Sequence, residues 1–277
     1  MQKTFTILLF LNFFFSLSFA KCQNDTLSVD KKKVKFYFLW GYNKDWYAKS
    51  SIRFQNDGNP NQKNEFGVYD FTIYDATAHD RPDFDQLNDI INITIPQFST
   101  RIGVFFGKNK QNGIELNYDH SKYVVKNYQK VRIAGTAFGK AFDKDTILDP
   151  NHIHFEHTDG ANFAMVNYVR VWDILKKCNT SNNKLFFVGK AGGGFVYPRT
   201  DVTLFGNRVN NNWHISGYCV GIETGLRAEL FKHIVFELTA KGVAANYNKC
   251  IIQGKNNGQA SHKMLAAEII FCFGFSL

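Results

Sequence analysis

The chain has 277 residues, a formal net charge of +9 and 16% aromatic residues. With only five prolines, this composition suits β-strands and argues against disorder. Beyond the N-terminal segment no apolar run approaches the roughly 20 residues of a spanning helix, which excludes a helical membrane protein. The five cysteines form no CxxC pair, so the sequence predicts no disulfide framework.

The N-terminus has the features of an export signal. Lys3 provides the positive charge, and an apolar stretch follows from Phe5 to Phe19. Ser18 and Ala20 are the small residues that a cleavage site requires, so we expect cleavage after Ala20. Residues 1–20 are then the signal peptide and residues 21–277 a single exported domain. An exported basic protein is expected to meet anionic lipopolysaccharide rather than nucleic acid.

Eight segments of the mature chain alternate between apolar and polar or small residues, which is typical of β-strands with two different faces. In chain order they are Val34–Tyr42, Phe98–Phe106, Ile114–Asp119, Phe163–Trp172, Leu185–Tyr197, Tyr218–Leu230, Ile234–Lys241 and Ile269–Leu277. The last is the clearest, because Ile269, Phe271 and Phe273 share one face while Cys272 and Gly274 share the other. Several segments have the roughly ten residues that a tilted strand needs to cross a bilayer.

The connections between these segments alternate in length. Short or medium ones are expected at Lys108–Asn112, Asp173–Asn183 and Phe231–His233, and long ones at Tyr47–Pro96, Val124–Asn151, Pro198–Asn212 and Lys249–Ser261. Short turns on one side and long loops on the other are typical of outer-membrane barrels. The sequence therefore predicts an all-β, antiparallel transmembrane barrel of eight strands whose first and last strands pair. Because Gly67–Tyr74 also reads as a strand, ten strands remain an alternative.

The faces opposite the bulky apolar ones carry a nearly balanced set of charges. The expected lumen acids are Glu115, Asp119, Glu223, Glu229, Glu237 and Glu268, and the bases are Lys35, Arg101, Arg170, Arg227 and Lys241. An eight-stranded barrel is only wide enough for side chains to fill. These charges are thus expected to pair in a packed polar lumen, with Glu268 facing partners such as Lys35, and a general diffusion porin is rejected.

Aromatic residues near the strand ends suggest interfacial girdles. Those toward the long loops are Trp46, Tyr123, Tyr197, Trp213 and Tyr247, and those toward the short turns are Tyr168 and Trp172.

Four stretches resemble an uncharacterised group of outer-membrane β-barrel proteins of Bacteroidetes-type bacteria. They are Gly41–Tyr47, Tyr69–Asp75, Ala78–Pro82 and Phe155–Gly160. The resemblance, to small OmpA/OmpX-like barrels, covers nearly all of the mature chain. It implies the Gram-negative outer membrane as location, with outer-membrane lipids, lipopolysaccharide and the barrel-assembly machinery as partners, and it brings no assigned activity.

Two clusters have residue types that could do chemistry. In a strand, His152, His154 and Glu156 share a face and could hold zinc, with His157 pointing away. The alternative is a polar strand end in contact with water. His214 and Ser216 also share a face, so that the imidazole could activate the hydroxyl as in the outer-membrane lipid A deacylases. No acidic residue of the same face is evident to orient the histidine.

The leading hypothesis is a non-enzymatic outer-membrane barrel with a packed lumen and long extracellular loops, in a structural or surface-interaction role and without a cofactor. One alternative is a lipid A-modifying hydrolase that uses His214 and Ser216. The other is a secreted soluble β-barrel that binds a small apolar ligand, which requires the bulky faces of the strands to point inward.

Overall fold

The structure of the chain is a computed structural model. It describes residues 34–58, 67–81, 97–157, 159–175, 182–255 and 257–277. The expected export signal, residues 1–20, lies outside these residues. In the described part of the chain, no helix is long and apolar enough to cross a membrane.

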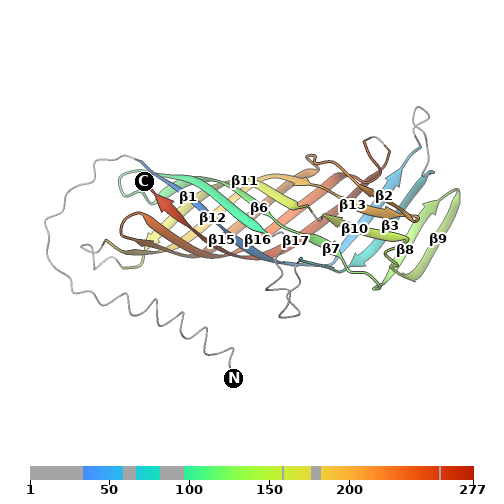
Figure 1. The fold of residues 1–277 in the computed structure, drawn as a ribbon, viewed down its shortest axis with the longest axis horizontal. Helices are drawn as coiled ribbons and strands as arrows, with labels where there is room; N and C mark the ends of the chain where they lie inside the picture. Colours follow the sequence, from blue (N-terminus) through green and yellow to red (C-terminus); the bar gives the residue numbers. More distant parts are fainter. Residues whose placement is uncertain (1–33, 59–66, 82–96, 158, 176–181, 256) are drawn as a thin grey trace, which may run out of the picture.

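Eight of the described strands form a closed antiparallel barrel, which we call the trunk (Figure 1). In their order around the ring they are β1 (Val34–Tyr47), β5 (Phe98–Phe106), β6 (Asn112–His120), β11 (Ala161–Asp173), β12 (Lys184–Pro198), β15 (Gly217–Leu230), β16 (Ile234–Ile251) and β17 (Gln259–Ser276). Pairing of β1 with β17 closes the ring, with Trp40 opposite Phe273. All eight predicted strands and the predicted closure are confirmed.

The trunk strands continue beyond the ring into a second structure, which we call the distal extension. Here the first residues of β17 pair with β2 instead of β1, and the sheet continues through β3 and β8 to β9. These strands span Ser50–Asn56 (β2), Tyr69–Ala76 (β3), Lys130–Ala137 (β8) and Lys140–Ile147 (β9). The strand-like segment Gly67–Tyr74 thus contributes β3 to this extension, and among the described strands the closed ring has eight members rather than ten.

A separate five-stranded sheet completes the distal extension. Its order is β14-β13-β10-β7-β4, with bounds Asn207–Asn210 (β14), Asp201–Leu204 (β13), Ile153–His157 (β10), Tyr123–Val125 (β7) and Ala78–His79 (β4). In Figure 1 the extension lies at the end of the molecule opposite the C-terminus. Segments that the sequence suggested to be long loops therefore contain short paired strands.

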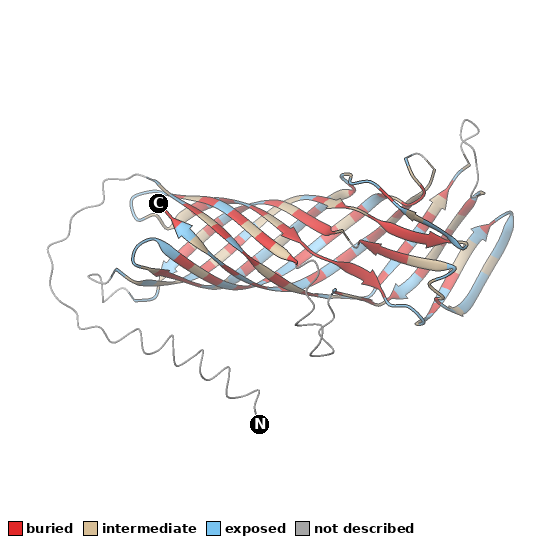
Figure 2. Cartoon of the chain, viewed as in Figure 1, coloured by how far each residue is buried: buried red, intermediate tan, exposed pale blue. Residues whose placement is uncertain are grey.

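Buried and exposed residues alternate along the trunk strands, as their colours show in Figure 2. On β17 the predicted apolar face points outward, where Ile269 and Phe273 remain 50% and 47% exposed, while Glu268 and Cys272 are buried. The apolar-ligand hypothesis required the bulky faces to point inward, and the structure has the opposite arrangement.

The distal extension has a hydrophobic core between its two sheets. Phe54 stacks on Phe71 and meets Phe155 edge to face, so β2, β3 and β10 contact through aromatic rings. The same cluster of buried residues reaches Met165 and Val243 at the mouth of the trunk. The extension thus covers the distal mouth of the barrel with a packed core.

Candidate functional site

Ion pairs fill the middle of the trunk. The Lys190 ammonium lies 3.0 Å from Glu115 and 3.0 Å from Glu223. It also lies 2.6 Å from Glu237, whose other oxygen is 2.5 Å from the Arg227 guanidinium. All five side chains are buried. Because a buried charge is costly without a partner, each of these groups depends on the others.

A second set of pairs continues toward the distal end. The Arg101 guanidinium is fully buried and lies 2.5 Å from Asp119 and 3.7 Å from Glu223. Lys241 pairs with Asp119 and lies 3.4 Å from Glu268. These contacts join side chains from five different strands across the lumen, where they occupy the centre of the barrel.

The lumen differs from the sequence prediction in three places. Lys190 was not predicted, yet it contacts three carboxylates. Arg170 faces outward, with its guanidinium 5.9 Å from the Trp172 ring, and it takes no part in the lumen pairs of the described residues. Glu268 is buried in the lumen as expected, but its partner is Lys241, because Lys35 pairs with Glu229 instead.

Only some of the aromatic residues suggested for the interfacial girdles lie on the outer wall. Trp46 and Trp172 are 52% and 44% exposed on the outer wall, and Tyr197 stacks on Trp213. Tyr123 and Tyr247 are instead fully buried in the distal core. Neither of these two tyrosines lies at a lipid interface, since each packs against His262.

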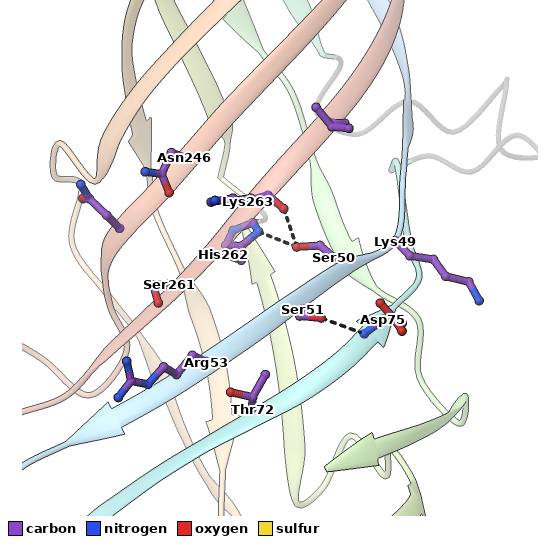
Figure 3. Close-up of a pocket in the computed structure, with 12 residues that line it drawn as sticks. Lys49, Ser50, Ser51, Arg53, Thr72, Asp75, Asn246, Ser261, His262 and Lys263 are labelled. Carbon is purple, nitrogen blue, oxygen red and sulfur yellow. Dashed lines mark hydrogen bonds between the residues drawn. The ribbon is translucent and has the colours of Figure 1, made fainter. Parts of the chain in front are cut away.

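A polar groove runs along the outside of the molecule where β2 leaves the trunk wall (Figure 3). Its lining includes Lys49 and Arg53 from β2 and the segment before it, and Ser261 and Lys263 from β17. At one end it is bounded by Leu265, the most distal residue of the exposed apolar face of β17. The groove therefore places cationic side chains directly beside the margin of the apolar wall.

The pair His214 and Ser216 is in contact, but not on the outer wall. The Ser216 hydroxyl lies 2.7 Å from Nε2 of His214 and is only 1% exposed. The alternation of β15 does not extend to Ser216, since the strand begins at Gly217, whose φ of +155° favours glycine. The alternation of the strand, extended back to Ser216, would place this side chain on the outer wall, whereas the structure buries it.

The hydrogen bonds of His214 also differ from those of a general base in a relay. Its Nε2 lies 3.0 Å from the backbone nitrogen of Ile251 and 3.0 Å from the carbonyl of Lys249, while its Nδ1 lies 3.0 Å from the carbonyl of Asn212. A carbonyl stands where a hydrolase relay has a carboxylate. The Nε2 atom that would take the serine proton is already in contact with these two backbone groups.

The three residues suggested for zinc are not brought together. His152 is exposed and lies 3.1 Å from Asp149, while His154 lies 3.2 Å from Glu156. Glu156 in turn pairs with Arg81. His154 and Glu156 are thus in contact with each other, but His152 pairs with Asp149 instead, so the three side chains do not converge on one point.

Another cluster brings together three possible metal ligands that lie far apart in the sequence and were not predicted to meet. His157 of β10, Cys250 of β16 and His262 of β17 are buried, and their ligand atoms lie within 4.8 Å of one another. Burial holds the pKa of both imidazoles below the usual value, that of His262 at about 3, and raises the pKa of the Cys250 thiol to about 12. At neutral pH the two imidazoles are uncharged and have lone pairs to offer.

The comparisons with known proteins give no family. No protein-family model and no curated protein matches the chain. Among solved structures it is similar to Neisserial surface protein A, with 9% identity over 86% of this chain and 96% of that chain and a TM-score of 0.27. It is also similar to Ail, the attachment invasion locus protein of Yersinia pestis, with 12% identity, coverage of 89% and 100%, and a TM-score of 0.28.

A third similar structure is the outer membrane protein OprG from Pseudomonas aeruginosa, with 11% identity, coverage of 88% and 94%, and a TM-score of 0.33. Identities and scores of this size say nothing of a shared role. The assignment as a closed barrel rests on the strand pairing of this chain.

Proposed function

We propose that the chain is a non-enzymatic outer-membrane barrel whose trunk anchors the distal extension outside the membrane. The observation that carries this proposal is the outer wall of the trunk, where each of the eight strands exposes large apolar residues. They include Trp40 (β1), Ile102 (β5), Leu116 (β6), Val166 (β11), Phe187 (β12), Ile222 (β15), Leu238 (β16) and Phe271 (β17). A monomer in water rarely exposes so large an apolar surface.

The height of this wall fits a bilayer. Along β17 and the residue that follows it, the wall runs from Leu265 to Leu277. With a rise of about 3.4 Å per residue and a tilt of about 40°, that segment spans roughly 30 Å along the barrel axis. The hydrocarbon core of a bilayer is about 30 Å thick. Lys263, just beyond Leu265, is exposed, so the wall becomes polar where the bilayer would end.

We also propose that the trunk does not conduct. Buried ion pairs from Lys190, Arg101 and Lys241 cross the lumen, and the distal core lies over one mouth. This supports a structural or surface-interaction role over that of a porin. In planar bilayers the purified protein should show no steady channel current, and a stable current at every insertion event would contradict the proposal.

The groove beside the apolar margin is the proposed contact for lipopolysaccharide. Lys49 and Lys263 are exposed there, at the level where lipid phosphates would lie, while Arg53 is already paired with Asp70. Ammonium groups at that level attract anionic headgroups. The double variant Lys49→Ala/Lys263→Ala should retain less lipopolysaccharide on purification than the wild type.

The matched control for this test is Lys140→Ala/Lys144→Ala, which removes two exposed ammonium groups from β9, far along the extension. Its lipopolysaccharide content should equal that of the wild type. An equal loss in both double variants would show that only net charge matters and would contradict the assignment of the groove.

The location itself is tested by membrane fractionation and gel mobility. The protein is expected in the outer-membrane fraction after export through its signal peptide and insertion by the barrel-assembly machinery. A folded barrel in detergent should also change its mobility when it is heated. Recovery from the soluble periplasm, without heat-dependent mobility, would contradict the proposal. Unchanged lipid A acylation in cells with and without the gene would exclude the hydrolase alternative.

A further inference from the structure

The buried cluster of His157, Cys250 and His262 lies at the junction of the two distal sheets. His157 ends β10 in the five-stranded sheet, whereas Cys250 and His262 lie on β16 and β17, which pair with each other. The exposed fractions of the three side chains are 0%, 0% and 4%. Two imidazole nitrogens and one thiol sulfur, from residues far apart in the sequence, thus lie close together in the buried interior.

Hydrogen bonding fixes the tautomer of His262. The Ser50 hydroxyl has one proton, and it donates that proton to the carbonyl of Lys263 at 2.7 Å. Its oxygen also lies 3.3 Å from Nδ1 of His262, so Nδ1 must carry the proton and donate it. The Nε2 atom of the neutral ring therefore has a lone pair, which is directed at Nε2 of His157.

His157 presents its own Nε2 to the same point. Nδ1 of His157 lies 3.1 Å from the Thr200 hydroxyl, and its Nε2 lies 3.2 Å from Nε2 of His262. Two imidazole nitrogens at 2.0–2.1 Å from one tetrahedral zinc ion are about 3.3 Å apart. Partners on the far nitrogens, here two hydroxyl groups, are what orient the histidines of metal sites.

The surroundings of the cluster are aromatic and hold it rigidly. The Tyr247 ring stacks on both imidazoles, with centroids 4.9 Å from His157 and 4.7 Å from His262. Tyr123 and Phe155 pack against the same rings. The positions of the two nitrogens are therefore set by packing, which is the preorganisation that a metal site requires.

We propose that His157, Cys250 and His262 form a metal site for a thiophilic cation, Zn²⁺ in the first place, with Cu⁺ as its chemical competitor. Two imidazoles and one thiolate suit these ions and are poor ligands for Mg²⁺ or Ca²⁺, which take oxygen. On binding, the Cys250 S–H bond breaks, its proton leaves to solvent and the thiolate sulfur bonds the metal. The proton that His157 shares from its Nε2 with His262 moves to its Nδ1, which then donates to the Thr200 hydroxyl, so both Nε2 atoms bind the metal through lone pairs. No oxidant or reductant is involved.

The site borders the groove and has a structural consequence. His262, one of its three members, also lines the groove of Figure 3. Once bound, the ion links β10 to the β16–β17 hairpin and so joins the five-stranded sheet to the barrel sheet. The proposal goes beyond the membrane role and does not depend on it.

The test uses the full chain, folded in detergent micelles and freed of metal with a chelator. Co²⁺ replaces zinc as a spectroscopic probe, because a cobalt–thiolate bond gives a near-ultraviolet charge-transfer band that imidazole ligands alone do not give. We expect one Co²⁺ per chain with this band, full displacement by one equivalent of Zn²⁺, and displacement by Cu⁺ if the site takes both ions.

Four variants make the test specific. Cys250→Ser should abolish the charge-transfer band, and His262→Gln should weaken cobalt binding at least tenfold. Cys219→Ser and His154→Gln are matched controls, since Cys219 is another buried cysteine of the same core and His154 lies on the same strand as His157. Both controls should bind cobalt as the wild type does.

Heat-dependent gel mobility of each variant verifies that the barrel has folded before cobalt is added. If the folded wild type gives no stoichiometric band, the two imidazoles share only an N–H···N hydrogen bond and the proposal is overturned. A band that survives in folded Cys250→Ser, or that Cys219→Ser removes, also overturns it.

Discussion

The trunk and the distal extension are built with opposite polarity on the same continuous strands. Along β17, the inward residue of the trunk is Glu268, whereas the inward residues of the extension are Met264 and His262. Outside, the trunk exposes Phe271, whereas the extension exposes charged pairs such as Arg132 with Asp143. The same strands run through both parts, with an irregularity in the β16–β17 ladder between Tyr247 and Cys250. The reversal of polarity is what a change of surroundings from lipid to water, as proposed, would require.

This comparison also separates two sources of stability. In the extension the hydrophobic effect favours burial of rings such as Phe54 and Phe155, as in a soluble protein. In the trunk the large apolar side chains point outward, so the hydrophobic effect does not bury them inside the protein. There the interior is held by ion pairs whose members cannot be removed singly without leaving a buried charge.

The largest effect is expected from breaking the lumen network. Lys190→Met leaves Glu115, Glu223 and Glu237 without their shared cation and should lower the free energy of unfolding by about 3–5 kcal/mol. Urea unfolding in lipid vesicles, followed by tryptophan fluorescence, measures it. Adding Glu237→Gln to the same chain should restore part of the loss. A single variant as stable as the wild type would mean that the network contributes little.

A loss of similar size, but confined to the extension, is expected from Phe155→Ala. Phe155 is 1% exposed and packs against Phe54 and His157, so its truncation should cost about 3–5 kcal/mol locally. Hydrogen exchange should show faster exchange in β2 and β10, with β5 and β6 still protected. Equal acceleration in all four strands would show that the extension and the trunk unfold as one unit.

A lysine introduced on the outer wall of the trunk should destabilise the protein more than a lysine introduced on the outer surface of the extension. Leu238 lies opposite Phe271 in mid-wall, so Leu238→Lys should destabilise the folded protein by about 2–4 kcal/mol in vesicles. Ile147→Lys, at an equally exposed apolar residue of β9, is the matched control and should change stability by less than about 0.5 kcal/mol. Equal effects of the two variants would remove the distinction between the two outer surfaces.

The smallest effect is expected from an exposed ion pair of the extension. Arg132 and Asp143 are each more than half exposed, so water screens the pair and Arg132→Met should leave the stability close to that of the wild type. The same urea unfolding measures it, and 0.5 M salt should reduce the difference further. A loss as large as that of Lys190→Met would show that exposure does not distinguish the ion pairs of the two regions.

Alternation predicted the trunk well because it reports a local property, namely which side of a strand faces apolar surroundings. Alternation was least informative for the one strand whose two faces carry the same kinds of residue. Leu185–Tyr197 is apolar and glycine-rich on both faces, so the inward direction of Lys190 could not be deduced. Asn167 also interrupts the alternation of Phe163–Trp172. Arg170 of this strand was assigned to the lumen, whereas the structure has Asn167 inside and Arg170 outside.

The distal extension was largely hidden from such reasoning. Its strands are short, and the segment Lys249–Ser261 was interpreted as a loop although β16 extends to Ile251 and β17 begins at Gln259. His157 and His262 meet only because β10 packs against the β16–β17 hairpin, a contact between residues 105 positions apart. No periodicity in the sequence reports such a pairing. The zinc hypothesis therefore favoured the adjacent His152, His154 and Glu156.

The central claim is that a bilayer surrounds the trunk and ends at the groove. Spin labels placed singly at outward positions of β17, from 263 to 275 in steps of two, test it in vesicles by their accessibility to oxygen and to a water-soluble nickel complex. We predict high oxygen and low nickel accessibility from 267 to 275, with a reversal at 263. Nickel accessibility that is high and uniform along the whole strand would contradict the account.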